Sequence, residues 1–599
     1  MNHDNAILAK ARYWASNAVF DEKTRAEVAK LLQENALAEL NERFYRNLSF
    51  GTGGMRGIMG AGTFRINCYN IQKATSALFL YLQESFPETR ELRLAISYDS
   101  RHKSREFAEA AAEVIVARGG RVFLTAEMRP TPLLSFLVRD FSCHGGICIT
   151  ASHNPSNYNG FKVYLAYGGQ LVPPHDQAVV AHYDRLENFI PEVPVAFAEA
   201  VRSGQVEEVG AELDKRYLAE ILKLSLYSGG REGLKIVYSP LHGTGGFLVP
   251  QALRVFGFTQ LFIPPEQAEP DGAFPSLVSP NPEDPRAFAL ALALASKVGA
   301  ELVMATDPDS DRIGVCIRER GGEYSFLNGN QLSCLLHEYL LAGLDAGGGL
   351  PAQGLVIKTI VTTDLLAEIA RHYGVSCEET LTGFKWIAAR IEAYERGEIL
   401  PYRQFICGGE ESYGFLAGTF VRDKDAVLAC ALTAEMVAYY KSKGLTLLEG
   451  LDEIFTRSGV YVEALHSVDL PGMAGAQQSA ALMQALASSP PHSLAGLRVE
   501  RVIDYNAATV KERRGEDFEL CARTTLNREQ TLQFILSDGS KLSVRPSGTE
   551  PKVKIYLAVV DKRRGLRGAA LAASKTALHE KLKRLAEALP LLLARLPSS

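Results

Sequence analysis

Short apolar runs alternate with segments of helical periodicity along most of this chain. Residues 92–97 form an apolar run, residues 104–117 space their apolar positions as a helix does, and residues 122–124 are apolar again. A second such cycle begins at residues 234–238, and a third begins at residues 355–359. Strands that alternate with helices are typical of parallel or mixed sheets covered by helices. The pattern therefore predicts an α/β protein.

The pattern changes near the C-terminal end. Residues 472–497 are rich in Ala, Ser and Gln with a helical rhythm, and apolar runs at residues 531–536 and 541–544 flank an Asp-Gly pair. Asp-Gly between two strand-like runs is a hairpin signal. A further helical pattern covers residues 568–589. These features predict a smaller C-terminal α+β domain.

The length of the chain predicts several domains. A chain of 599 residues is too long for a single hydrophobic core, and domains of about 150 residues are common. Changes in pattern occur near residues 225, 335 and 465. We therefore predict four domains, formed by residues 1–225, 226–335, 336–465 and 466–599.

Composition narrows the class of protein. A hydrophobic content of 47% and a charged content of 22% are those of an ordinary globular protein. The net charge of −5 argues against nucleic acid as a partner, because nucleic-acid-binding proteins usually present a basic field. Nine cysteines without a Cys-x-x-Cys pair fit reduced thiols in the cytoplasm. No secretory or membrane-spanning segment is recognisable, so we expect a cytoplasmic protein without a membrane partner. These features leave the oligomeric state open.

The first chemical motif is the segment TASHNP at residues 150–155. It follows the apolar run at residues 146–149, so it places Ser152 where a buried strand gives way to a turn. Strand ends and the loops beyond them are where α/β enzymes keep reacting groups, and we expect this serine to be exposed there. A surface turn without chemistry is the alternative.

The second motif places three carboxylates at alternate positions, at Asp307, Asp309 and Asp311. Like charges at this spacing repel one another unless a cation lies between them, and an all-oxygen ligand set suits magnesium or calcium. The segment is no EF-hand loop, because Arg312 replaces the required glycine and Arg318 replaces the required glutamate. A structural acidic turn is the alternative.

The third motif is the segment RPSGTEPK at residues 545–552. A guanidinium, two hydroxyls and a glycine that lets backbone amides approach an anion are suited to binding phosphate. The segment lacks the ending of a nucleotide P-loop. The fourth motif is GEESYG at residues 409–414, where Glu410 and Ser412 could bind sugar hydroxyls.

Together, the four motifs resemble those of the α-D-phosphohexomutase superfamily, over roughly residues 45–560. Residues 50–57, 380–386 and 421–425 are similar to segments of its longer phosphoglucomutase/phosphopentomutase branch. The resemblance implies an α/β fold with a four-domain architecture, in which three mixed α/β sheet domains and a smaller C-terminal α+β domain surround a central cleft.

The resemblance also implies catalytic roles. Ser152 would carry a phosphoryl group, and Mg²⁺ would be held by Ser152 together with Asp307, Asp309 and Asp311. Arg56 matches the family arginine that reaches the phosphoserine, and Lys162 matches the family lysine near the phosphoserine. Lys424 matches the second family lysine, an acid/base group of the glucose branch. We expect neighbouring cations to lower the pKa of such a lysine and make it a general base.

Two further side chains at these motifs have open roles. His153 is expected to point away from Ser152 along the turn, where ordering the loop and taking part in catalysis are both possible. Arg312 could add charge for the substrate or pair with a neighbouring acid. No Gly-x-Ser-x-Gly elbow surrounds Ser152, which argues against a serine hydrolase.

The substrate implied by the resemblance is a phosphosugar. The expected function is interconversion of glucose 1-phosphate and glucose 6-phosphate through a phosphoserine and glucose 1,6-bisphosphate. The alternatives are a phosphomannomutase or phosphopentomutase of the same mechanism and a non-catalytic sugar-phosphate-binding protein. Gly414 stands where the bacterial dual-specificity enzymes have a histidine, which favours the glucose or pentose branch. The expected substrate contacts are Arg312, Thr382, Gly383, Lys385, Glu410, Ser412, Arg545, Ser547, Gly548 and Thr549.

Overall fold

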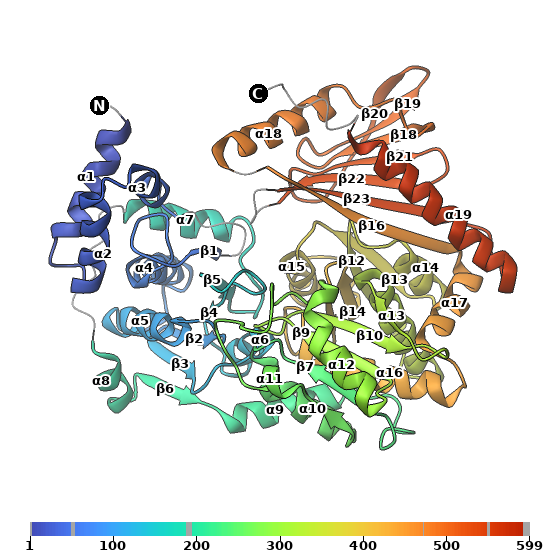
Figure 1. Cartoon of the computed structure of the whole chain (residues 1–599), viewed down its shortest axis with the longest axis horizontal. Helices are drawn as coiled ribbons and strands as arrows, with labels where there is room; N and C mark the ends of the chain where they lie inside the picture. Colours follow the sequence, from blue (N-terminus) through green and yellow to red (C-terminus); the bar gives the residue numbers. More distant parts are fainter. Residues whose placement is uncertain (1–2, 49–53, 187–194, 471, 548–551, 591–599) are drawn as a thin grey trace. The chain divides into compact units, whose positions relative to one another are not determined.

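The computed structural model describes residues 3–48, 54–186, 195–470, 472–547 and 552–590 (Figure 1). Its contacts divide the chain into two compact units. The first unit contains residues 1–327, 388–398 and 414–439, and the second contains residues 328–387, 399–413 and 440–599.

The first unit begins with three helices, which are α1 (His3–Ser16), α2 (Glu22–Gln33) and α3 (Leu37–Phe44). Trp14 stacks on Phe20 with ring centroids 4.3 Å apart, and Phe44 is fully buried beside them. The Asp21 side chain accepts a hydrogen bond from the Thr24 amide and so caps α2. These helices thus have a small aromatic core of their own.

A six-stranded sheet follows, in the order β1-β5-β4-β2-β3-β6. The strands β4, β2, β3 and β6 run parallel, whereas β5 pairs antiparallel with both β4 and β1. The run predicted at residues 92–97 is β2, and the helix predicted at residues 104–117 is α5, so this cycle is confirmed. The strands are β1 (Gly54–Ile58), β2 (Arg93–Tyr98), β3 (Arg121–Thr125), β4 (Gly145–Ile149), β5 (Tyr158–Leu165) and β6 (Val206–Val209).

Helices pack on this sheet, and α5 and α6 contact its central strands (Figure 1). The apolar residues of α4 and α5 join those of β2 and β4 in one large hydrophobic core. The helices are α4 (Cys68–Ser85), α5 (Ser104–Ala117), α6 (Thr131–Asp140), α7 (His175–Arg185), α8 (Phe197–Arg202) and α9 (Ala211–Leu222).

The second sheet of this unit has the order β11-β10-β9-β7-β8. Strands β8, β7 and β9 are parallel, and β10 returns antiparallel from β9, so the acidic motif forms the turn between β9 and β10. The strands are β7 (Ile236–Ser239), β8 (Leu261–Phe262), β9 (Leu302–Thr306), β10 (Ile313–Arg318) and β11 (Tyr324–Leu327). The helices of this part are α10 (Gly245–Val255), α11 (Pro265–Ala268), the 3₁₀ helix Pro285–Phe288 and α12 (Ala289–Val298). The strand β15 (Gly414–Ala417) and most of α16 (Ala426–Ser442) also belong to the first unit.

The second unit begins with three parallel strands in the order β13-β12-β14. The run predicted at residues 355–359 lies in β12, which is fully buried. Helix α13 opens with a capping box formed by Asn328 and Gln331. The elements are α13 (Gly329–Ala346), β12 (Gly354–Thr359), α14 (Leu365–His372), β13 (Ser376–Thr380), the start of α15 (Phe384–Glu395), β14 (Gln404–Glu410) and α17 (Leu447–Ser458).

The C-terminal part is rich in β structure, with strand order β16-β23-β22-β21-β18-β19-β20, and β17 pairs with β18. The predicted hairpin is confirmed as β21 and β22, which pair antiparallel. The helix predicted over residues 472–497 is wrong at its end, because α18 stops at Ser488 before Pro490 and Pro491, which cannot continue a helix. The elements are β16 (Val460–Asp469), α18 (Gly472–Ser488), β17 (Ser493–Leu494), β18 (Leu497–Asp504), β19 (Thr509–Arg514), β20 (Asp517–Arg523), β21 (Leu532–Leu536), β22 (Lys541–Pro546), β23 (Lys552–Asp561) and α19 (Gly568–Glu587).

Within the second unit, the C-terminal sheet packs against the end of β12. Tyr505 and Tyr556 from this sheet share a buried apolar cluster with Ile360 and Leu381. The Gln533 side-chain amide also donates a 2.8 Å hydrogen bond to the Ile360 carbonyl. Burial of these side chains ties the C-terminal sheet to the sheet that carries β12.

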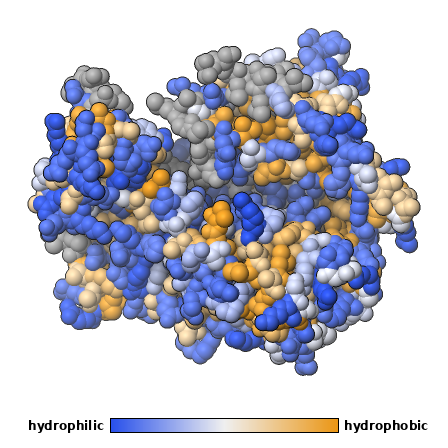
Figure 2. Space-filling view, viewed as in Figure 1, coloured by the Kyte–Doolittle hydropathy of each residue, from blue (hydrophilic) through white to orange (hydrophobic). Residues whose placement is uncertain are grey.

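The viewed surface mixes hydrophilic and hydrophobic side chains (Figure 2). Among the described helices, none combines the length and the apolarity that a membrane crossing requires. The architecture is thus three α/β sheets and a C-terminal β-rich part, in agreement with the predicted fold class. The three predicted domain boundaries, near residues 225, 335 and 465, stay predictions.

Candidate active site

Ser152 lies three residues beyond β4, in a turn whose backbone is unusual. Its φ is +51°, in the left-handed region that side-chain-bearing residues seldom adopt. Its amide donates to Thr150 Oγ1 at 2.8 Å, and its Oγ donates to Asp307 Oδ2 at 2.7 Å. The residue is only 1% exposed, so the expectation of an exposed serine is wrong. The acidic turn after β9 lies against the serine and buries it.

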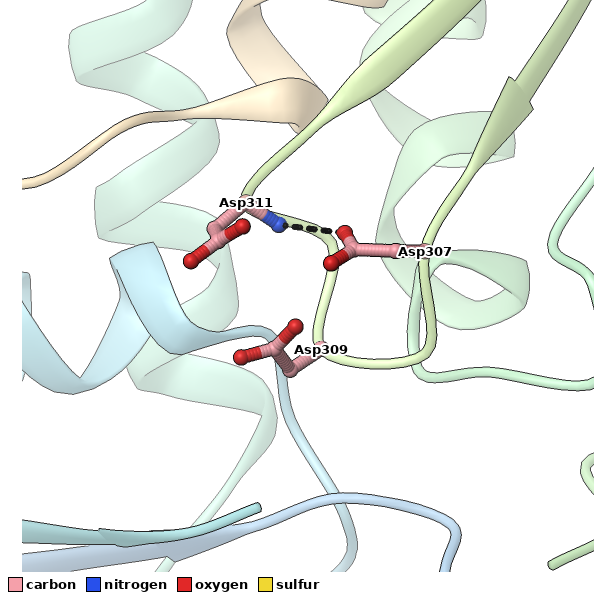
Figure 3. A group of neighbouring side chains, drawn as sticks. All are labelled: Asp307, Asp309 and Asp311. Carbon is pink, nitrogen blue, oxygen red and sulfur yellow. Dashed lines mark hydrogen bonds between the residues drawn. The ribbon is translucent and has the colours of Figure 1, made fainter. Parts of the chain in front are cut away.

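The three carboxylates of that turn point toward a common space (Figure 3). One oxygen from each of Asp307, Asp309 and Asp311 lies within 4.8 Å of the others, and all three residues are buried. The backbone holds the turn in shape, because Asp307 Oδ1 accepts 3.1 Å hydrogen bonds from the amides of Asp311 and Arg312. The predicted alternate spacing thus produces a real cluster.

The cluster fits a bound cation. Within the part of the chain that the structure describes, Asp309 Oδ1 and Asp311 Oδ1 are buried and have no hydrogen-bond partner. Buried acceptors without partners are costly in free energy, and a hard cation would coordinate these oxygens. Burial and the charges of Asp309 and Asp311 raise the pKa of Asp307 well above its usual value. The residues present therefore suit a divalent ion with oxygen ligands.

Two lysines balance part of this charge. Lys162 Nζ lies 2.6 Å from Asp309 Oδ2 and 3.0 Å from Asp311 Oδ2, and Lys424 Nζ lies 3.2 Å from Asp311 Oδ2. Burial opposes the charge on Lys162, but these carboxylates outweigh it and raise its pKa above the usual value. The expectation that cations lower the pKa of Lys162 is therefore wrong, since its nearest partners are anions. Although burial acts against it, the two lysines hold the pKa of Asp311 well below its usual range.

Lys424 is fixed by its neighbours in the loop between β15 and α16. Asp423 Oδ1 contacts Lys424 Nζ at 3.0 Å, while Asp423 Oδ2 accepts hydrogen bonds from Tyr164 and Gln170, each at 2.7 Å. Asp425 is fully buried, accepts from the Leu428 amide at 2.9 Å and so caps α16. The segment at residues 421–425 therefore positions Lys424 through the two acids that flank it.

His153 and Arg56 lie at the serine loop. His153 Nδ1 lies 3.2 Å from Ser152 Oγ, so the expectation that its side chain points away from the serine is wrong. The tight turn brings these adjacent side chains to the same side. Arg56, on β1, donates to the Asn154 side chain at 3.3 Å. Residues 50–53 of the glycine-rich segment lie outside the described residues.

Arg312 pairs with acids. Its guanidinium donates to Glu283 Oε1 at 2.7 Å, and its Nε lies 3.8 Å from Asp311 Oδ1.

Thr131 was missed by the sequence analysis, although its amide donates to the Asp309 carbonyl and its hydroxyl donates to Asp309 Oδ2, both at 2.8 Å. The only sequence signal for Thr131 is its position at the start of a helix, which many threonines share.

The second unit holds the predicted sugar loop. Glu410 is buried at the end of β14, and its Oε1 accepts a 2.9 Å hydrogen bond from the amide of Gly383, whose φ is +112°. Lys385, at the start of α15, lies over the Trp386 ring at 5.0 Å. The structure therefore brings Gly383 and Glu410 together. Two further predicted substrate contacts, Thr382 beside Gly383 and Ser412 near Glu410, are partly exposed.

The predicted phosphate loop begins at the end of β22. Arg545 Nε donates to Glu529 Oε1 at 2.5 Å, and this ion pair raises the arginine pKa although burial opposes it. The Ser547 amide donates to the Lys552 carbonyl at 2.8 Å. Gly548 and Thr549 lie outside the described residues.

Comparisons with known proteins find relatives over most of the chain. The description "Phosphoglucomutase/phosphomannomutase, alpha/beta/alpha domain" matches as domain I at residues 47–189, as domain II at residues 215–322 and as domain III at residues 328–457. Phosphoglucomutase from Staphylococcus aureus strain MRSA252 is 33% identical over 533 residues, which cover 89% of this chain and 93% of that protein. The chain therefore belongs to the phosphoglucomutase/phosphomannomutase family. It is a phosphotransferase of the mutase class.

Solved structures agree on the fold. The open form of parafusin, a phosphoglucomutase from Paramecium, has a TM-score of 0.64 at 18% identity and covers 92% of this chain and 95% of its own. A phosphoglucomutase/phosphomannomutase family protein from Burkholderia thailandensis has a TM-score of 0.61 at 20% identity, with 89% and 96% covered. These similarities show the shared fold.

The acidic cluster predicts stabilisation by a divalent cation. Saturating Mg²⁺ or Mn²⁺ should raise the melting temperature, because a ligand at 100 times its Kd stabilises a fold by about 2.7 kcal/mol. Asp309→Asn should remove most of this shift, whereas Glu266→Gln, at an exposed acid of the same unit, should keep it. Differential scanning fluorimetry with and without metal measures both. An equal shift in the wild type and Asp309→Asn would exclude the cluster as the metal site.

Asp425 predicts a pH dependence of stability. Burial raises its pKa to about 6, from an ordinary value of 3.8. The folded state then binds more protons than the unfolded state between these values, so this group lowers stability as pH rises through that window. The free energy of unfolding of Asp425→Asn, minus that of the wild type, should therefore rise by about 2 kcal/mol from pH 4 to pH 7. Urea denaturation across pH measures it, and a flat difference would contradict the raised pKa.

Proposed function

We propose that this enzyme moves a phosphoryl group between two hydroxyls of a hexose through a covalent phosphoserine at Ser152. The observation that carries the proposal is the 2.7 Å hydrogen bond from Ser152 Oγ to Asp307, inside a buried acidic cluster with two unpartnered oxygens. A phosphoryl carrier needs a nucleophile and neutralisation of the oxygens on phosphorus, and these are the groups gathered here.

In the first half-reaction, a sugar hydroxyl oxygen attacks the phosphorus of phosphoserine 152. The new P–O bond forms as the bond to Ser152 Oγ breaks, and the hydroxyl proton passes to a base, for which we propose the neutral amine of Lys424, formed once Asp311 no longer pairs with it. Ser152 Oγ must gain a proton as it leaves, and His153 Nδ1, 3.2 Å away, is within reach to supply it. Lys162 would remain charged and hold the acidic cluster. The second half-reaction reverses these steps with the other phosphate of the intermediate.

We propose Mg²⁺ as the resident cation, held by Asp307, Asp309 and Asp311 together with Ser152. Its chemistry would be to neutralise the negative charge on the transferring phosphoryl group. Arg56 would hold the Ser152 loop through Asn154 and add a second positive charge near the serine.

The second unit carries the groups proposed to hold the rest of the substrate. Glu410 and Ser412, with Thr382, Gly383 and Lys385, would bind the ring hydroxyls. Arg545 with Ser547, Gly548 and Thr549 would bind the phosphate that is not reacting, because a guanidinium binds phosphate in a bidentate manner. Arg312 would leave its pairing with Glu283 when it contacts substrate.

We propose glucose as the sugar, with glucose 1-phosphate and glucose 6-phosphate as substrate and product and glucose 1,6-bisphosphate as the intermediate. The relative from Staphylococcus aureus that is named phosphoglucomutase supports this assignment, as does Gly414. The nine cysteines are free thiols, which supports a cytoplasmic location.

The covalent mechanism predicts that Ser152→Ala abolishes mutase turnover, because no other group can carry the phosphoryl to the bisphosphate intermediate. Intact-mass analysis and peptide mapping should find one phosphate on Ser152 in active wild-type enzyme. Ser142→Ala, at an exposed serine of the same sheet domain, should retain both activity and phosphate. Near-normal turnover of Ser152→Ala, or active enzyme without phosphate there, would refute the mechanism.

The proposed sugar predicts a ranking of substrates. Glucose 1-phosphate should have the highest kcat/KM when compared with the 1-phosphates of mannose, ribose and deoxyribose. Discrimination against mannose should be modest, on the order of a few kcal/mol, if few polar contacts read the one inverted hydroxyl. A coupled assay on each sugar measures the ranking. A higher value for mannose or for a pentose would reassign the substrate and leave the phosphoserine mechanism in place.

A further inference from the structure

One buried arginine lies inside the loop that carries Ser152. Arg101 follows β2 and is only 3% exposed. Its Nη2 donates to the carbonyls of Ser152 and Asn154, each at 2.5 Å. Its Nη1 donates to the carbonyls of Pro155 and Tyr158 at 2.7 and 3.1 Å. A single guanidinium therefore gathers four main-chain carbonyls of one loop.

The guanidinium is itself held from the other side. Its Nε lies 3.3 Å from Asp99, whose Oδ1 also accepts hydrogen bonds from the Arg101 amide at 3.0 Å and from the Ser104 hydroxyl at 2.7 Å. Asn159, in the strand after the serine loop, donates to Ser104 Oγ at 3.0 Å. A buried polar network thus joins the end of β2, the start of α5 and the start of β5.

A loop of the first unit, in the connection between α11 and the 3₁₀ helix, covers this arrangement. The Phe274 ring lies 5.0 Å from the Arg101 guanidinium, in cation–π geometry. Gly272 approaches so closely that an added Cβ would lie 2.5 Å from the His102 nitrogen and 2.8 Å from the Ser100 oxygen. The segment at residues 271–275 therefore lies directly on the Arg101 turn.

Four carbonyls that converge on one point require a cation or several donors between them. Their dipoles repel one another, and in a buried site each would lack a partner without the guanidinium. Arginine suits this position because its planar fork offers five donors in fixed directions. Ser152 also has a left-handed backbone, which the surroundings must stabilise.

We propose that Arg101 is the positioning residue of the catalytic serine. It acts through the main chain, because it contacts the Ser152 carbonyl and has no role in bond making. By fixing the carbonyls on both sides of the turn, it keeps Ser152 in the left-handed conformation that directs Oγ to Asp307. Phe274 keeps water from the guanidinium and so maintains these hydrogen bonds. The inference rests on the proposed phosphoserine function for its kinetic consequence only.

The first test is independent of activity. Amide hydrogen exchange in peptides covering residues 150–160 should be about tenfold or more faster in Arg101→Gln than in the wild type, because the loop opens locally once its central donor is lost. Arg101→Lys should lie between the two, since an ammonium can satisfy up to three of the carbonyls. Arg105→Gln, at a partly exposed arginine in the first turn of α5, is the matched control and should exchange as the wild type does. Equal exchange in Arg101→Gln and the wild type would overturn the proposal.

The second test separates positioning from substrate binding. In Arg101→Gln we expect kcat to fall on the order of 10²-fold while KM stays nearly constant, because misplacement of a reacting group by about 1 Å can have that effect. Phe274→Leu, which keeps the guanidinium, should show a smaller fall in kcat and provides a second variant if Arg101→Gln does not fold. Guanidinium ion added to Arg101→Gly should restore part of kcat, whereas sodium ion should not.

The two hypotheses fail in different ways. If the wild type has no mutase activity and no phosphate on Ser152, the proposed function is wrong, while the exchange experiment still decides whether Arg101 orders the loop. If the wild type is active and phosphorylated but Arg101→Gln keeps full kcat, the proposed function stands and the positioning role is refuted. A rise in KM alone would also refute it, because that result would place Arg101 in substrate binding.

Discussion

Repulsion among three buried carboxylates is the constraint around which the first unit is organised. Asp307, Asp309 and Asp311 lie together in a site that excludes water, and an uncompensated cluster of that kind opposes folding. Compensation comes from other places in the chain, which are Lys162 on β5, Lys424 before α16 and the hydroxyls of Ser152 and Thr131. The same contacts that make the acidic turn tolerable also bring the proposed nucleophile, the proposed metal ligands and the two lysines together. Stability and chemistry are therefore coupled at this site.

The chemical motifs and most of the sheet elements could be predicted from the sequence because they depend on local signals. The run at residues 104–117 has helical periodicity and became α5, and the Asp-Gly turn at residues 538–539 joins β21 and β22. Alternate acids after an apolar run also gave the cluster, because a tight turn projects such side chains to one side. The end of α18 was misjudged, since the Ala-rich run ends at Ser488, and Pro490 and Pro491 cannot continue the helix.

The roles of supporting residues could not be predicted, because they depend on contacts between segments far apart in the sequence. Arg101 acts on a loop about fifty residues away, and nothing near it in sequence marks it from other arginines. Thr131 reaches Asp309 across 178 positions. The direction of the pKa shift of Lys162 was also misjudged. The sequence shows lysines and arginines near the motifs, but it does not show that carboxylates are the nearest partners of Lys162. Long-range packing decides each of these cases.

The packing of the C-terminal sheet on β12 has a consequence for substrate length. Tyr505 and Tyr556 share their apolar cluster with Ile360, so the strand that leads to Arg545 is anchored within the same unit as Glu410. Arg545 is close enough to influence the pKa of the adjacent Glu411. The separation between the proposed hydroxyl-binding carboxylate and the proposed phosphate-binding guanidinium is therefore set by buried side chains and not by a loose linker. A ligand whose hydroxyls and phosphate are spaced differently from Glu410 and Arg545 can therefore bind to only one of these two groups at a time.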